Sequence, residues 1–60
     1  MQQLTIGQRF TVNGTEFLFE AADLYNVMLR NTKTARITIY GRRAFEITMR
    51  QLGYEVKYQN

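Results

Sequence analysis

The sequence has no cysteine, histidine, serine, proline or tryptophan. Without cysteine the chain cannot form a disulfide, and without cysteine and histidine it lacks the ligands of an ordinary zinc site. A nucleophilic triad needs a base beside serine, cysteine or threonine, and histidine is the usual base. These absences predict a protein with no metal, no cofactor and no catalytic residues.

Long hydrophobic runs are missing as well. No segment approaches the roughly 20 apolar residues that a membrane span needs. The first residues, Met1-Gln2-Gln3, have neither the basic nor the apolar region of a secretory signal. We therefore expect a cytoplasmic protein that makes no membrane contact.

The few carboxylates do not indicate catalysis either. General acid–base chemistry needs a tuned carboxylate pair in a cleft. The candidates in this chain are instead expected on ordinary exposed helix or strand surface. They are Glu16, Glu20, Asp23, Glu46 and Glu55. We predict that the protein is not an enzyme.

A chain of 60 residues forms one small domain at most. It buries only about 60% of the surface that it exposes when unfolded. The composition is 45% hydrophobic, with four Phe and four Tyr, which is too apolar for disorder. With disulfides and zinc excluded, a well-packed core or a partner subunit must supply stability.

The clearest local pattern is Asn13-Gly14 between two alternating segments, residues 4–12 and 15–20. Asn-Gly in this setting predicts a two-residue hairpin turn, because both positions need positive φ. The turn sets Val12 opposite Thr15 and Phe10 opposite Phe17. Alternation then places one set of apolar side chains on the core face. That set is Leu4, Ile6, Phe10, Val12, Phe17 and Phe19.

Four further elements are predicted. The Ala-, Leu- and Met-rich segment 21–31 favours a helix, and the β-branched segment 34–40 favours a strand. Residues 42–52 favour a second helix, with Phe45, Met49 and Leu52 on its core face and Gly53 as its C-cap. Residues 54–58 close the chain as a short strand. We expect a single α+β domain over residues 1–60, in the order β-β-α-β-α-β. Its N-terminal β-hairpin is joined by two helices packed on one face of a mainly antiparallel sheet.

Arginines gather around the second predicted helix. Arg42 and Arg43 stand in its first turn, where positive charge is unfavourable for the helix itself and therefore suggests contact with an anionic partner. Arg43, Ile47 and Arg50 share an outward stripe. A solvated surface with no special role explains the same residues, and Gly41-Arg42-Arg43 is far short of a phosphate-binding loop.

Two more groups are predicted to make contacts. Arg36 and Tyr40 are expected on the sheet face opposite the core, where they would extend the partner-binding surface of Arg42, Arg43, Ile47 and Arg50. The wide apolar arc of the helix predicted over 21–31, together with Leu18, exceeds what one small core can bury. For self-association the sequence therefore suggests Leu18, Tyr25 and Leu29.

Charge does not decide the partner. The chain carries a net +3, with −1 in residues 1–30 and +4 in residues 31–60. We expect a non-enzymatic protein-binding module, homodimeric, that inhibits or modulates a larger protein partner. Its size alone suggests an accessory protein of a phage or another mobile element. The alternative is a small basic regulator that binds nucleic acid, although a strand between the helices excludes helix-turn-helix spacing.

Overall fold

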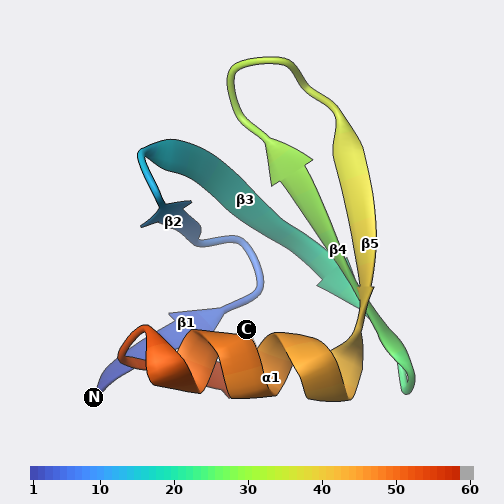
Figure 1. The fold of residues 1–60 in the computed structure, drawn as a ribbon. Helices are drawn as coiled ribbons and strands as arrows, with labels where there is room; N and C mark the ends of the chain where they lie inside the picture. The colour runs from blue at the N-terminus through green and yellow to red at the C-terminus, as the bar shows by residue number, and fades with distance from the viewer. Residues whose placement is uncertain (59–60) are drawn as a thin grey trace.

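The computed structural model describes residues 1–58 and contains six strands and one helix (Figure 1). In chain order these are β1 (Gln2–Thr5), β2 (Arg9–Val12), β3 (Thr15–Ala22), β4 (Asn26–Asn31), β5 (Ile37–Gly41), α1 (Arg42–Gln51) and β6 (Tyr54–Lys57). The chain is a small α+β domain made mostly of strands. No helix in the described part of the chain is both long and apolar enough to cross a membrane.

The strands form two sheets. One is antiparallel and has the order β2-β3-β4-β5; the other is a parallel pair of β1 and β6. Figure 1 shows α1 and β1 on the same side of the four-stranded sheet. Side chains from both layers meet in one core. These are Leu4, Phe10, Phe19, Val27, Leu29, Phe45 and Met49, all at most 5% exposed.

The predicted N-terminal hairpin is confirmed. Asn13 and Gly14 have φ of 52° and 80°, as the two-residue turn requires. Val12 pairs with Thr15 and Phe10 with Phe17, in the predicted register.

The predicted core face of the hairpin is confirmed as well. Leu4, Phe10 and Phe19 are buried, and Ile6, Val12 and Phe17 pack partly buried against them. The Phe19 ring lies 5.4 Å from that of Phe45, so the hairpin is fastened directly to the helix.

The helix predicted over residues 21–31 is wrong. Residues 21 and 22 end β3, a turn follows, and β4 begins at Asn26. Asp23 makes this turn, because its Oδ1 accepts the N–H groups of Tyr25 (2.8 Å) and Asn26 (2.7 Å). Burial then alternates along β4, with Val27 inside and its neighbours outside. Pairing on both sides outweighs the helix propensity of Ala, Leu and Met.

The order is accordingly β-β-β-β-β-α-β, with one helix rather than two. The second predicted helix is confirmed at Arg42–Gln51, with Phe45 and Met49 buried, but Leu52 is 48% exposed instead of core-facing. Gly53, with φ of 93°, ends it. The strand predicted over 54–58 forms as β6 and runs parallel to β1, not beside β5.

The strand predicted over 34–40 begins later, at Ile37, since Ala35 has a positive φ of 63°. Its two faces are the reverse of those predicted. Tyr40 pairs with Val27 and so lies on the core side of the sheet, whereas Ile39 pairs with Met28 on the outer side. The reason is that β5 takes its register from β4, a strand formed where the sequence pattern predicted a helix.

Candidate functional site

The outward face of α1 carries three of the predicted contact residues. The helix buries Phe45 and Met49, so residues on its opposite side face solvent. Ile47 is 52% exposed there and lies between the exposed side chains of Arg43 and Arg50. These three residues line one hollow of about 440 Å³ together with Glu46 and Gln51. The predicted stripe is therefore present.

The β3–β4 turn extends this face. The turn fixed by Asp23 leaves Leu24 and Tyr25 at its tip, 77% and 76% exposed. Both line a second hollow, of about 290 Å³, whose other side is formed by the first turn of α1. The two hollows share Arg43 and Glu46, so they form one continuous surface. We call it the helix surface and define it as Leu24, Tyr25, Arg43, Ile47 and Arg50.

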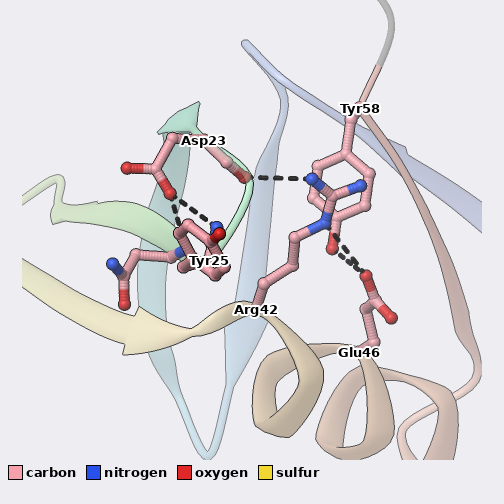
Figure 2. A network of polar contacts seen from close by, with 6 residues as sticks. Asp23, Tyr25, Arg42, Glu46 and Tyr58 are labelled. Atoms are coloured by element: carbon pink, nitrogen blue, oxygen red, sulfur yellow. Dashed lines mark hydrogen bonds and ion pairs between the residues drawn. The ribbon is translucent and has the colours of Figure 1, made fainter.

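Arg42 does not join this surface as a free cation. Its Nη1 donates to the carbonyl oxygen of Asp23 at 3.0 Å, and its Nε lies 3.4 Å from Oε2 of Glu46 (Figure 2). Its guanidinium carbon is 3.6 Å from the ring centre of Tyr58. The Tyr58 hydroxyl donates to the same Glu46 oxygen. Arg42 thus ties the turn, the helix and the end of β6 together.

Two pKa values reflect this arrangement. Burial, with a contribution from the hydrogen bond to Glu46, raises the pKa of Tyr58 from 10.0 to about 12. The two backbone N–H groups that bind the carboxylate of Asp23 lower its pKa below the usual 3.8. Both shifts favour the protonation states present near neutral pH. The network around Arg42 is therefore structural support for the helix surface.

The remaining partner-binding predictions lie elsewhere. Arg36 is exposed in the β4–β5 loop, at the opposite end of β5 from α1 (Figure 1). Tyr40 was predicted on the face opposite the core, and this is wrong. Its side chain instead lines a mainly apolar hollow of about 350 Å³ between the sheet and α1, beside Phe45 and Leu29. The structure therefore does not bring Arg36 and Tyr40 to the helix surface.

The residues predicted for self-association are split among three places. Leu29 is 4% exposed in the core, so it cannot form a contact between folded copies. It was predicted on the wide apolar arc of a helix over residues 21–31, where the structure has β4 instead. Leu18 is half-buried on the outer face of the sheet, opposite Arg9 and Arg30. Tyr25 belongs to the helix surface.

The sequence did not identify the residues that support the helix surface through the β3–β4 turn and the contacts of Arg42. Leu24 falls within residues 21–31, which were predicted to form a helix, and Asp23, Glu46 and Tyr58 were not among the predicted contact residues. An Asp followed three residues later by an Asn, between two apolar segments, is a turn signal. It predicts a turn at Asp23 and an exposed side chain at Leu24. No comparable signal in the sequence brings Arg42 to Tyr58, which are far apart in the chain.

Residues 1–58 contain no group of three or more carboxylate, histidine or cysteine side chains that could hold a metal ion. The helix surface offers two guanidinium groups, two aliphatic side chains and one phenol, which suit recognition more than bond making. Comparison of the chain with protein-family models, curated proteins and solved structures finds no match.

Proposed function

We propose that the chain is a non-enzymatic, homodimeric protein-binding module that inhibits or modulates a larger protein partner by docking through the helix surface. One observation carries the proposal: Leu24, Tyr25 and Ile47 are 77%, 76% and 52% exposed on a single continuous surface. Clustered exposed apolar side chains are the usual mark of a contact site, whereas isolated ones are not. Tyrosine and arginine are also the residues most enriched at interface hot spots.

The helix surface also suggests the chemistry of its partner. Ile47 stands at its centre, and Arg43 and Arg50 stand on either side of it. A complementary partner surface has an apolar centre bordered by carboxylates, because rim charges of opposite sign steer association. The Arg42 network holds the turn against the helix, so little ordering is needed on docking, which favours affinity.

The alternative is a basic regulator that binds nucleic acid. Arg36, Arg43 and Arg50 make no ion pair with a carboxylate among residues 1–58, which favours this reading. Their placement does not, because Arg36 precedes β5, whereas α1 begins after the other end of that strand. A nucleic-acid strand is bound best along one continuous basic groove. Protein binding is therefore the function that we favour.

The test compares three tagged baits in quantitative capture from cell extract: the wild type, Ile47→Glu and Thr11→Glu. Thr11 is an exposed residue of β2, so Thr11→Glu is a matched charge control away from the helix surface. We expect the true partner to be lost at least about tenfold with Ile47→Glu, as for an interface hot spot. It is expected to be retained with Thr11→Glu. Equal capture by all three baits contradicts the proposal.

A second arm separates the two functions. The chain is titrated with labelled mixed-sequence DNA and RNA at about 150 mM salt, where the Debye length is near 8 Å. The protein-binding proposal expects no tight binding. Micromolar binding with a steep salt dependence, weakened by Arg43→Ala and by Arg50→Ala, would establish the nucleic-acid alternative instead.

A further inference from the structure

We infer that β5 is a dimerisation edge, along which a second copy of this chain adds its own β5 in antiparallel orientation. This inference rests on the proposed function, which includes a homodimer, and it identifies β5 as the surface through which the two copies pair. β5 is an end strand of the four-stranded sheet, and all of its residues are exposed. Among the described residues no strand other than β4 pairs with β5, and in Figure 1 α1 turns back under the sheet.

The backbone of β5 presents hydrogen-bonding groups along this free edge. In antiparallel pairing, successive residues point their N–H and C=O groups to opposite edges of the strand. Arg36 and Arg42 flank β5, and both bond on its β4 side. The carbonyl oxygen of Arg36 accepts the N–H of Asn31, and the N–H of Arg42 donates to the carbonyl oxygen of Tyr25, each at 2.8 Å. The groups of Ile37 and Ile39 therefore point away from β4 and toward the free edge.

Nothing in β5 blocks the addition of another strand. Native sheets protect an exposed edge with charged side chains, proline or a bulge. The sequence of β5 is Ile-Thr-Ile-Tyr-Gly, and its pairing with β4 continues without a shift. β2, at the other edge of the same sheet, is one residue shorter and carries the charged Arg9. β5 is therefore the edge better suited to pairing.

The side chains beside the edge are compatible with a second copy. Ile37 and Ile39 are 44% and 61% exposed on the outer face. The neighbouring cation, Arg30, is neutralised, because its Nε donates to Oε1 of Glu20 at 2.9 Å. It also donates from Nη1 to the carbonyl oxygen of Ala35 at 3.0 Å. The strip next to β5 is thus apolar without net charge, so two copies do not repel each other across it.

One register uses all these features. This register sets Thr38 opposite Thr38 of the second copy. Ile37 then lies opposite Ile39 of the second copy, and Ile39 lies opposite its Ile37. Arg36 then lies opposite Tyr40 of the second copy, where a guanidinium can stack on the ring. The twofold axis of such a pair is perpendicular to the sheet. Both α1 helices therefore lie on the same side of one continuous sheet.

A single introduced cysteine tests this register, because the native chain has none. The Thr38 pair is of the non-hydrogen-bonded kind, in which Cα atoms are about 4.5 Å apart, a distance that a disulfide bridges. We expect Thr38→Cys to crosslink under mild oxidation at least about tenfold faster than Thr11→Cys, since pairing gives the thiols an effective concentration on the order of millimolar. Thr11 lies on β2 and controls for random encounter. Equal rates overturn the inference.

Solution mass gives the second test. Light scattering from micromolar to millimolar protein is expected to approach a dimer mass for the wild type and to stay at a monomer mass for Ile39→Pro. Proline at this position removes an N–H that faces the free edge, so the bonds between β4 and β5 are kept. If that variant loses its circular dichroism spectrum, Ile39→Lys replaces it, because an edge lysine also blocks pairing.

The outcomes distinguish the two proposals. A dimer mass retained by the folded Ile39 variants overturns the β5 interface and leaves the homodimer itself intact. A monomeric wild type at millimolar concentration overturns the homodimer. Neither result bears on docking through the helix surface, which is judged by capture with Ile47→Glu.

Discussion

The two edge strands of the four-stranded sheet, β2 at one end and β5 at the other, have similar side chains but differ in how far these are buried. At the β2 end, Phe10 is 4% exposed and its ring lies 5.7 Å from Phe17 and 6.2 Å from Phe45. At the β5 end, Tyr40 lies on the same side of the sheet as Phe10, facing α1, and yet it is 45% exposed. Apolar character alone therefore does not decide burial. What differs is the layer that covers each end.

Chain connectivity explains the difference in cover. α1 begins directly after β5, at Arg42, and runs from there toward β1 (Figure 1), which pairs with β6. A helix that starts at an edge strand and turns inward cannot cover the whole of that strand. The β2 end is closed by the helix and the parallel pair, and the β5 end stays open. The closed end provides stability, and the open end is free for contacts.

The largest expected effect separates the two ends by stability. Phe19→Ala removes a ring that is 0% exposed and should cost about 3–5 kcal/mol. That loss is comparable with the whole stability of a small domain, so we expect a largely unfolded chain. Ile39→Ala, at the open end, should change the free energy of unfolding by no more than about 0.5 kcal/mol in dilute monomer.

Urea unfolding followed by circular dichroism measures both variants. Similar midpoints for Phe19→Ala and Ile39→Ala would contradict the division into a closed and an open end. Repeating the Ile39→Ala experiment at high protein concentration separates a stability effect from an effect on dimerisation, because only the latter depends on concentration.

The next effect concerns the joint between the open end and the helix. Arg42→Ala removes the hydrogen bond to Asp23 and the stacking on Tyr58, and we expect a loss of about 1–2 kcal/mol. Arg43→Ala is the matched control, since Arg43 is exposed and should change stability by no more than about 0.5 kcal/mol. Thermal unfolding measures the melting temperatures of the two variants, and we expect the lower one for Arg42→Ala. Equal melting temperatures would show that the network does not support the fold.

The hairpin could be predicted because its determinants are local. Asn13-Gly14 requires one turn geometry, and the turn then sets the register of every pair between β2 and β3. The helix from Arg42 was also predictable, since Gly41 and Gly53 bound a segment with its apolar residues at helical spacing. In both cases a few neighbouring residues decide the structure.

The segment 21–31 could not be predicted from propensity, because its structure depends on distant partners. Val27 and Leu29 are buried alternately against the hairpin and α1, and β3 and β5 supply their hydrogen bonds. The error propagated, since the faces of β5 follow from β4. Of the candidate site, the stripe of Arg43, Ile47 and Arg50 was predictable from helical spacing. Leu24 was missed, although the spacing of Asp23 and Asn26 is a signal for the turn that exposes it.

A smaller effect tests the closed end at high pH. The pKa of Tyr58 is raised from 10.0 to about 12, so its protonated form is favoured in the folded state. This contribution is complete below pH 10 and is lost as the pH rises toward 12. We expect the wild type to lose stability over that window more steeply than Tyr58→Phe, which cannot ionise. Denaturant unfolding at several pH values measures the slopes.

The smallest effect concerns the turn that presents Leu24 and Tyr25 at the open end. The pKa of Asp23 lies below 3.8 because its carboxylate binds two backbone N–H groups. Its contribution is therefore present above that pH and lost as the pH falls through the lowered pKa. We expect the wild type to lose stability below about pH 4 through this group, and Asp23→Ala to lack that part of the acid dependence.

Amide exchange locates the change within the fold. In Asp23→Ala the N–H groups of Tyr25 and Asn26 lose their acceptor, so their exchange should be faster, while that of Phe19 in the core should be unchanged. Because the turn carries Leu24 and Tyr25, a looser turn should also weaken partner capture. It should do so less than Ile47→Glu, which changes the centre of the helix surface. Unchanged exchange at residues 25 and 26 would show that Asp23 does not hold the turn.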